Sequence, residues 1–257
     1  NNFKRDIDEV TYLMNIIEKI SEFNVENNSK ELEKNLNMIN RKNMKCVSFG
    51  KTSNGKSAVI NALLGEKVLP SSKGRTTSCF VSVEGCNNID EHFTDSVGQS
   101  HEIQQLQSLT NEQQKDSYQI NDLLRVYWPR HKCRLLENDL EIFDSPGVDY
   151  TKENNEWIDK YCEDADVFVL VLDCTSTLNQ SERDFFMKVK RKIATPNIIV
   201  LINKWDTTDD DSEDEKEELR KQYFETICGF FKSDLQLYKE TDLFLSERIY
   251  FISAILA

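Results

Sequence analysis

The stretch Gly50-Lys51-Thr52-Ser53-Asn54-Gly55-Lys56-Ser57 has the spacing G-x4-G-K-S, which is typical of loops that bind phosphate. It follows a β-rich run over 46–49 and precedes a helical pattern over 56–64. Glycines permit tight turns that aim successive backbone N–H groups at phosphate oxygens, and the N-terminus of the next helix adds its dipole. We therefore expect a strand, a phosphate loop and a helix here. An ordinary glycine-rich turn between a strand and a helix is the alternative.

Two side chains of this loop are expected to carry charge and metal chemistry. Lys56 would reach the β- and γ-phosphates of a nucleotide, and the Ser57 hydroxyl would bind Mg²⁺. The backbone N–H groups around them would hold the remaining phosphate oxygens. The predicted nucleotide-binding residues of the loop are Ser53, Asn54, Gly55, Lys56, Ser57 and Ala58.

A second motif, Asp144-Ser145-Pro146-Gly147, follows the apolar run 140–143. Alone, D-x-x-G is usually a turn. After a phosphate loop, an aspartate at a strand end can hold Mg²⁺, usually through water. We therefore expect Asp144 to bind the metal and the Gly147 amide to bind the γ-phosphate.

A third motif, Asn203-Lys204-Trp205-Asp206, follows the apolar run 198–202. The Asp206 carboxylate can accept hydrogen bonds from both N1–H and N2–H2 of guanine, a donor pair that adenine lacks. A site built for such a pair discriminates strongly, because a mismatched base leaves a buried charge unpaired. We expect Asn203 at the O6/N7 side of guanine, the Lys204 stem over the base, and Trp205 either as a reporter of the nucleotide state or as a core aromatic residue. Ser253, after the last strand, would offer a backbone amide to O6.

The segment between the first two motifs contains Gly74-Arg75-Thr76-Thr77. A threonine in such a switch segment binds Mg²⁺ through its hydroxyl and the γ-phosphate through its amide, so it is ordered only in the triphosphate state. We assign this role to Thr77, with Thr76 as the alternative and as a second nucleotide contact. A polar loop that leads into a strand is the plainer interpretation.

Short β-rich runs alternate with helical patterns from residue 45 onward, which is typical of an α/β fold with a mostly parallel central sheet flanked by helices. The predicted helices cover 56–64, 156–162, 182–192 and 213–231. The predicted strands cover 46–49, 79–83, 124–128, 140–143, 167–172, 198–202 and 249–252.

The first part of the chain reads differently. Apolar residues recur at helical spacing over 4–41, with a polar, asparagine-rich stretch between two predicted helices. We expect residues 1–43 to be N-terminal helices of a helical bundle that sequence outside this chain completes, and residues 44–257 to be one nucleotide-binding domain. The start at Asn1 is consistent with a piece of a longer protein.

Composition excludes several classes of protein. A net charge of −13 over 257 residues argues against nucleic acid as the main partner. Seven cysteines without a C-x-x-C pair argue against a disulfide framework or a zinc site. Apolar runs stay well short of the roughly 18 residues of a membrane helix. The acidic run 207–218 is expected to be a solvated loop entering a helix, with a metal or basic-partner site as the alternative.

The chain resembles the mitofusins, a family of large GTPases in the dynamin superfamily, and especially its fuzzy-onions-type members. The strings that carry the resemblance are more specific than the general nucleotide-binding motifs. They are GKTSNGKSAVINALLGEKVLPS from Gly50, GRTTSCFVSVEG from Gly74, DSPGVD from Asp144, WIDKYCEDADVFVLV from Trp157 and NKWD from Asn203.

This resemblance implies that the chain is a GTPase domain that binds GTP and GDP with Mg²⁺. It implies homodimers that form through the nucleotide face of the GTPase domain, and turnover that drives tethering and fusion of membranes. It also implies a place on the mitochondrial outer membrane, facing the cytosol, with the anchor outside this chain. Two positions depart from the family: Arg75 stands where vertebrate members have His, and Ile255 replaces the usual lysine that packs on the base.

Hydrolysis needs a group that positions the attacking water and a positive charge that stabilises the transition state. Small GTPases place a glutamine after D-x-x-G to orient the attacking water, whereas this chain has Val148. We expect dimerisation to order the switch segment, so that the Thr77 backbone positions the water and Arg75 acts as an arginine finger. Lys56 completes the predicted catalytic set. An exposed loop position for Arg75, and Lys51 as the source of charge, are alternatives.

Two other functions remain open at this point. One is a GTP-binding interaction module with little hydrolysis, which Val148 and Ile255 keep open. The other is another P-loop NTPase, an ATPase or small-molecule kinase, which Asn203 and Asp206 disfavour.

Overall fold

The computed structural model describes residues 39–71, 79–87, 90–109, 122–147, 161–162, 164–193, 195–237 and 246–255, together with Leu32 and Leu36. The chain divides into two compact units, 1–44 and 45–257. In the first unit, Leu32, Leu36, Ile39 and Asn40 are helical. The prediction of bundle helices in 1–43 falls mostly outside the described residues and stays a prediction.

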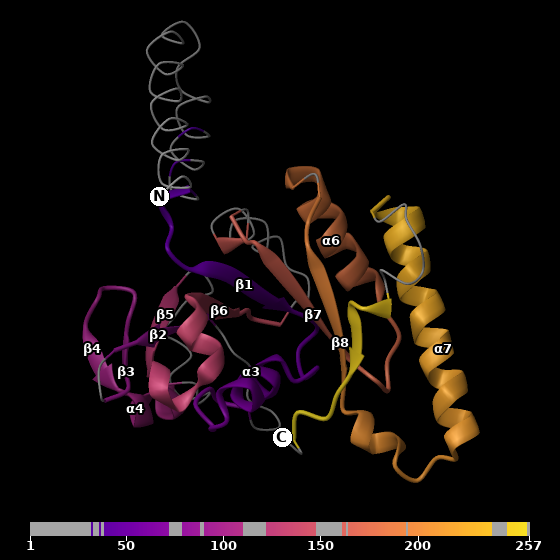
Figure 1. The fold of residues 1–257 in the computed structure, drawn as a ribbon, viewed down its shortest axis with the longest axis horizontal. Helices are drawn as coiled ribbons and strands as arrows, with labels where there is room; N and C mark the ends of the chain where they lie inside the picture. The colour runs from indigo at the N-terminus through magenta and orange to yellow at the C-terminus, as the bar shows by residue number, and fades with distance from the viewer. Residues whose placement is uncertain are drawn as a thin grey trace, which may run out of the picture. The chain divides into compact units, whose positions relative to one another are not determined.

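A nine-stranded sheet organises the second unit, with the strand order β4-β3-β5-β2-β6-β1-β7-β8-β9 (Figure 1). The strands that correspond to the sequence prediction extend one to three residues beyond it at half of their ends, whereas β2 begins one residue later and β9 ends one residue earlier than predicted. They are β1 (Met44–Phe49), β2 (Phe80–Cys86), β5 (Leu123–Pro129), β6 (Leu140–Asp144), β7 (Val167–Asp173), β8 (Ile198–Asn203) and β9 (Ile249–Phe251).

The half of the sheet that carries the phosphate loop is parallel. β1 pairs with β7, β7 with β8, and β8 with β9, all in parallel register. Parallel strands bring their carboxyl ends to the same edge of a sheet, which is where ligands bind in α/β folds. The residues that follow β1, β7, β8 and β9 therefore meet at this edge.

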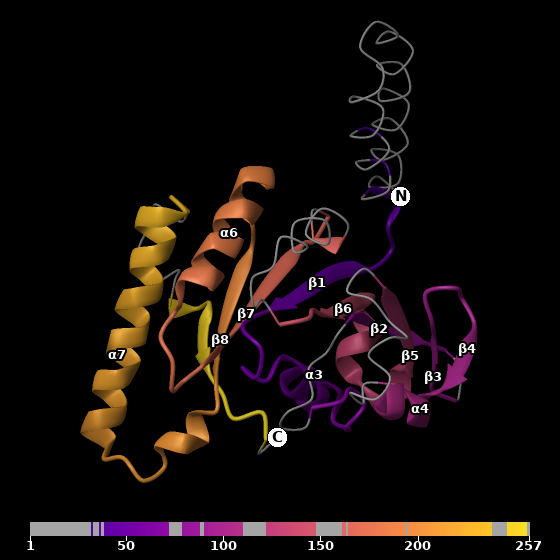
Figure 2. The same ribbon diagram turned by 180° about the vertical axis from the view of Figure 1, so that it is seen from behind.

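The other half of the sheet is mixed. β2 pairs parallel with β5 and antiparallel with β6, and β3 (His92–Thr94) pairs antiparallel with both β5 and β4 (Ser100–Glu102). The short strands β3 and β4 and the helix α4 (Ile103–Leu109) were not predicted. Figures 1 and 2 place them at the end of the sheet opposite to β8.

Buried side chains form a core on each face of the sheet. One core is rich in phenylalanine and packs against α6 (Gln180–Lys192) and α7 (Glu213–Gly229), and the other packs against α3 (Lys56–Leu64) and α4. Ile142 and Phe143 are neighbours in β6 but belong to different cores, because successive side chains of a strand point to opposite faces. Helices therefore cover both faces, as predicted.

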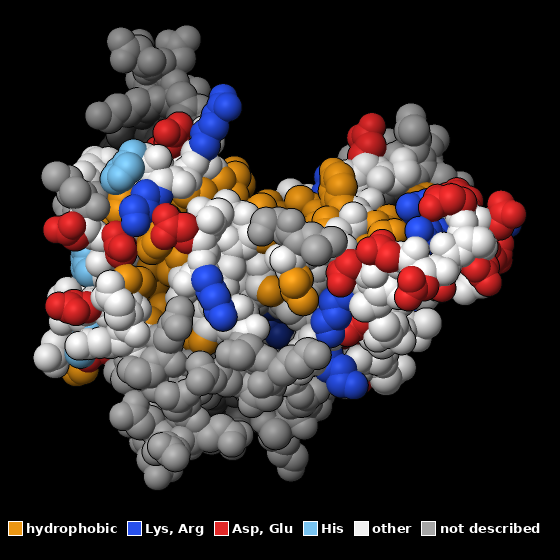
Figure 3. All heavy atoms as spheres, turned by 90° about the horizontal axis from the view of Figure 1, so that it is seen from below, with side chains coloured by type: hydrophobic (Ala, Val, Ile, Leu, Met, Phe, Trp, Pro, Cys, Tyr) orange, Lys and Arg blue, Asp and Glu red, His pale blue; other side chains and the backbone are white. Residues whose placement is uncertain are grey.

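The ends of the helices follow from local chemistry. Asn179 with Glu182 and Ser212 with Glu215 form capping boxes at the starts of α6 and α7, in which side chain and backbone satisfy each other's hydrogen bonds. The acidic run 207–218 thus leads into α7 as predicted, and acidic side chains gather over this region (Figure 3). The predicted helix 156–162 lies outside the described residues except for Tyr161 and Cys162. None of the described helices is long and apolar enough to cross a membrane.

Candidate nucleotide-binding site

The phosphate loop runs from Gly50 to Gly55, between β1 and α3. Gly55 is the N-cap of α3 with φ 91°, and Ser53 has φ 70°. Both conformations lie in the left-handed region, which glycine adopts most easily. The Gly55 carbonyl accepts the helical hydrogen bond from Val59 N at 2.9 Å. The loop therefore wraps ahead of the helix N-terminus, as a phosphate site requires.

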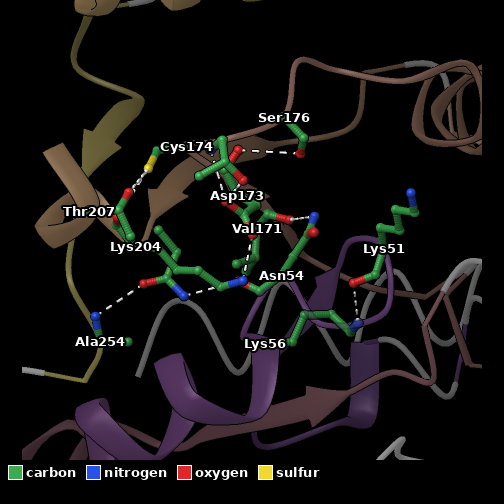
Figure 4. Close-up of polar contacts among 12 residues, drawn as sticks. Lys51, Asn54, Lys56, Val171, Asp173, Cys174, Ser176, Lys204, Thr207 and Ala254 are labelled. Atoms are coloured by element: carbon green, nitrogen blue, oxygen red, sulfur yellow. Dashed lines mark hydrogen bonds and ion pairs between the residues drawn. The ribbon is translucent and has the colours of Figure 1, made fainter. Parts of the chain in front are cut away.

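Lys56 is the first residue of α3, and its buried side chain turns back to the loop. Its Nζ donates to the backbone carbonyls of Gly50 at 2.9 Å and Lys51 at 3.3 Å (Figure 4). The loop carbonyls thus hold the ammonium group in place. Oxygen atoms of a bound phosphate would replace these carbonyls as its hydrogen-bond acceptors. Figure 3 shows the molecule from below, the side on which α3 lies. The surface is hollowed near the middle of this view, and a basic side chain lies in the hollow.

Ser57 and Asp144 meet across the loop. Ser57 Oγ donates to Asp144 Oδ2 at 2.5 Å, and Asp144 is buried at the end of β6. A hydroxyl and a carboxylate are oxygen ligands of the kind that Mg²⁺ prefers. Among the described residues no group of three or more His, Cys, Asp or Glu side chains gathers to hold a metal.

The D-x-x-G motif lies directly against the phosphate loop. A Cβ on Gly147 would stand 1.9 Å from Thr52 Oγ1 and 2.8 Å from Thr52 Cα. Only a glycine permits such a close approach of two backbones. The Gly147 amide is therefore beside the loop, as the predicted γ-phosphate contact requires.

Asn203 ties the base-reading motif to the phosphate loop. Its Nδ2 donates to the Asn54 carbonyl at 3.0 Å, and its Oδ1 accepts from Ala254 N at 3.0 Å (Figure 4). The side chain is only 2% exposed. We predicted that Asn203 faces guanine O6/N7. In the structure its amide holds together the loops that follow β1, β8 and β9.

Asp206 and Ser253, which we predicted to contact the base, lie side by side. The Asp206 backbone N–H donates to Ser253 Oγ at 2.8 Å. Asp206 Oδ1 is buried from solvent and has no hydrogen-bond partner in the part of the chain that the structure describes. A buried carboxylate oxygen without a donor is costly. The site therefore suits a ligand that brings donors, such as N1–H and N2–H2 of guanine.

Lys204 is held by a residue that we did not predict. Lys204 has φ 64°, and its Nζ donates a hydrogen bond of 2.5 Å to Oδ2 of that residue, Asp173. Burial would raise the pKa of the Asp173 carboxyl, but hydrogen bonds from Lys204 and Thr175 outweigh burial and hold that pKa below its usual value. Asp173 ends β7, so its position at the carboxyl end of an apolar run was the signal available in the sequence.

Cys174 contacts the loop that contains Lys204 and Thr207. Cys174 Sγ lies 3.0 Å from the Lys204 carbonyl and 3.0 Å from Thr207 Oγ1 (Figure 4). Burial raises the pKa of the Cys174 thiol, so the group stays protonated. Trp205 packs edge-to-face on Phe251 at 4.5 Å and is partly buried, which places it against the core.

Several predicted residues are not placed by this structure. Arg75, Thr76, Thr77 and Val148 lie outside the described residues, so their predicted roles stay predictions. Ile255, the position where the usual lysine is missing, is 73% exposed.

The chain is similar in sequence to known proteins. The sequence pattern that describes the dynamin family matches residues 46–205. Human mitofusin-2 is 42% identical over 219 residues, the transmembrane GTPase Marf of Drosophila melanogaster 39% over 218, and the transmembrane GTPase fzo-1 of Caenorhabditis elegans 40% over 229. These matches cover 84–85% of this chain but only 26–29% of the relatives.

A solved structure of an oligomerised bacterial dynamin pair is similar in fold, with a TM-score of 0.64 and 14% sequence identity. The likeness covers 95% of this chain and 36% of that one.

Proposed function

Because this chain belongs to the dynamin family and is a GTPase domain similar to those of the mitofusins, we propose that it binds GTP with Mg²⁺ and hydrolyses it to GDP and phosphate. The observation that carries the proposal is the buried Asp206 Oδ1, which lacks a donor among the described residues and lies in a motif tied by Asn203 to the phosphate loop. Guanine supplies the missing donors.

In this proposal, each of the groups described above has one task. Lys56 and the loop N–H groups bind the phosphates, and the Gly147 amide meets the γ-phosphate. Ser57 and Asp144 hold Mg²⁺, which neutralises the charge of the β- and γ-phosphates when it is bound. The pairing of Lys204 with Asp173 orients the lysine stem beside the base.

Catalysis is assigned to Lys56, Thr77 and Arg75. Thr77 would complete the metal site and help to position the attacking water, since Val148 cannot do so. Arg75 would place a guanidinium near the β- and γ-phosphates, where positive charge stabilises the transition state. Arg75→Ala with unchanged turnover at saturating GTP would remove Arg75 from this set.

For the whole protein we propose a role in mitochondrial membrane fusion. Homodimers would form through the nucleotide face and order the switch segment, and GTP turnover would drive tethering and fusion at the outer membrane, with this domain in the cytosol. The support is the similarity to mitofusin-2, Marf and fzo-1 over this domain.

The test of base recognition is Asp206→Asn. An asparagine offers one acceptor and one donor in place of a carboxylate, so at least one guanine hydrogen bond is lost and a donor faces a donor. Hydrogen bonds to charged groups contribute about 1.5–3 kcal/mol each, so the GDP affinity should fall about 100-fold or more if both are lost. Asp209→Asn, an exposed aspartate three residues on, is the matched control.

Titration with a fluorescent GDP analogue measures the affinity, and ATP serves as the competing nucleotide. Equal GDP affinities of Asp206→Asn, Asp209→Asn and the unaltered chain would refute guanine recognition by Asp206. Hydrolysis is measured separately as phosphate release against protein concentration. Specific activity that rises with concentration, for GTP alone, supports a dimer-activated GTPase, whereas GDP binding without phosphate release supports the interaction module.

A further inference from the structure

Glu182 is a buried carboxylate on α6 that the nucleotide chemistry above does not use. We propose that it is a positioning residue, which fixes the phosphate loop in its binding conformation before the nucleotide arrives. The proposal rests on the proposed GTP-binding function, because it concerns the same loop. The proposal adds Glu182, a helix residue, to the site. Glu182 contacts Lys51 of the loop, although the two residues are 131 positions apart in sequence.

The contacts of the carboxylate join α6 to the loop. Glu182 Oε1 accepts from the backbone N–H of Lys51 at 3.3 Å and from Asn54 Nδ2 at 3.1 Å. Glu182 Oε2 accepts from Asn179 N at 3.1 Å, within the capping box of α6. One oxygen therefore serves the loop and the other serves the helix.

A comparison within the chain shows that the helix cap does not require this burial. Glu215 occupies the same position in the capping box of α7 and is exposed. Hydrogen bonds from Ser212 lower its pKa. Glu182 is only 2% exposed, and burial raises its pKa despite its hydrogen bonds. Burying a carboxylate is unfavourable unless donors repay it, so the burial of Glu182 is explained by its contacts with the loop.

Glu182 is one of three anchors that converge on Asn54. Asn54 Nδ2 also donates to the Val171 carbonyl of β7 at 2.8 Å, and the Asn54 carbonyl accepts from Asn203, the last residue of β8. The neighbouring Ser53 is thereby held in its left-handed conformation, with φ 70°. A loop that is fixed in advance does not lose conformational entropy when phosphate binds, so its affinity is higher than that of a mobile loop.

The test is Glu182→Gln, which keeps the size of the side chain. A carboxylate accepts at both oxygens, whereas an amide accepts at one atom and donates at the other. Whichever way the glutamine faces, either the loop or the cap meets a donor instead of an acceptor. We expect the Kd for a fluorescent GDP analogue and the KM for GTP to rise about tenfold, while kcat at saturating GTP changes less than about threefold, because ground-state phosphate contacts are lost.

Two controls separate positioning from stability. Glu215→Gln makes the same substitution in a capping box that does not touch the loop, and Asn179→Ala weakens the α6 cap while leaving the carboxylate in place. Both should keep the GDP affinity of the unaltered chain, although Asn179→Ala should lower the melting temperature. An affinity loss in Asn179→Ala as large as that in Glu182→Gln would mean that helix fraying is the cause, and it would overturn the proposal.

Asn54→Ala keeps the proposal testable if Glu182→Gln does not fold. It removes the side-chain donor that the loop offers to Glu182 and leaves the Lys51 N–H in place, so we expect a comparable rise in Kd, and no further rise in the double variant beyond the larger single effect. Unchanged GDP affinity in Glu182→Gln, or in Asn54→Ala where the former is unfolded, would refute the role of Glu182. Failure of the unaltered chain to bind GDP would instead refute the proposed function.

Discussion

Gly55→Ala tests how the phosphate loop and the base-reading loop are held together. Gly55 has φ 91°, and a Cβ added to it would stand 2.3 Å from Asn203 Nδ2. The methyl group would therefore push the Asn203 amide out of its place. That amide bonds both the Asn54 carbonyl and the Ala254 N–H, so both hydrogen bonds are at risk from one added carbon atom.

The free-energy cost of Gly55→Ala has two parts. One lowers the free energy of unfolding, and the other also lowers the GDP affinity. The left-handed conformation costs an alanine about 1–2 kcal/mol relative to glycine, which lowers the free energy of unfolding. Loss of the two Asn203 hydrogen bonds costs about 1–3 kcal/mol together. The second part loosens the base-reading loop, so the GDP affinity should fall about fivefold to a hundredfold.

Gly65→Ala is the matched control. Gly65 ends α3 with φ 74°, and a Cβ there would meet no heavy atom within 4 Å. This variant carries the backbone strain without the clash. Urea unfolding without nucleotide should show a larger loss of stability for Gly55→Ala than for Gly65→Ala, and titration with fluorescent GDP should show a loss of affinity only for Gly55→Ala. Equal losses of stability, with GDP affinity unchanged in both variants, would refute the reasoning.

Two further predictions concern charges away from the nucleotide. Lys45→Met should lower the free energy of unfolding by about 1–3 kcal/mol, because Lys45 Nζ lies 2.6 Å from Asp164 and 4.4 Å from the centroid of the Phe143 ring. Thermal unfolding measures the loss. If the losses from Lys45→Met and Asp164→Asn simply add in the double variant, the ion pair does not contribute. The hydrogen bond from His101 holds the pKa of the Asp95 carboxyl below its usual value. The stability that this carboxylate contributes is therefore present above about pH 4, where an unperturbed aspartate titrates. It is lost as the pH falls through the pKa of the folded state. The difference in urea midpoint between the unaltered chain and Asp95→Asn should therefore stay constant above about pH 5 and shrink as the pH falls below about 4, and a difference that stays constant down to about pH 3 would contradict the assignment.

Much of the fold was predictable because its signals are local. An apolar run with the length of a strand, such as 167–172, is recognised from adjacent residues, and so is the acidic run 207–218 that leads into α7. The strands β3 and β4 escaped prediction because three residues such as His92-Phe93-Thr94 carry too short a pattern. β3 is a strand because β5 offers its edge, and β4 is a strand because β3 does, which is a property of the assembled sheet.

The site divides in the same way. The spacing of Gly50, Lys56 and Ser57 predicted a phosphate loop, and the order of the three motifs predicted a preference for guanine, since each motif is a run of neighbours along the chain. Only the tertiary structure decided what these residues touch. Asn203 bonds Asn54 across 149 positions, and Glu182 bonds Lys51 across 131. Such contacts arise because parallel strands bring distant loops to one edge of the sheet, and a sequence pattern records the strand ends but not which side chains meet there.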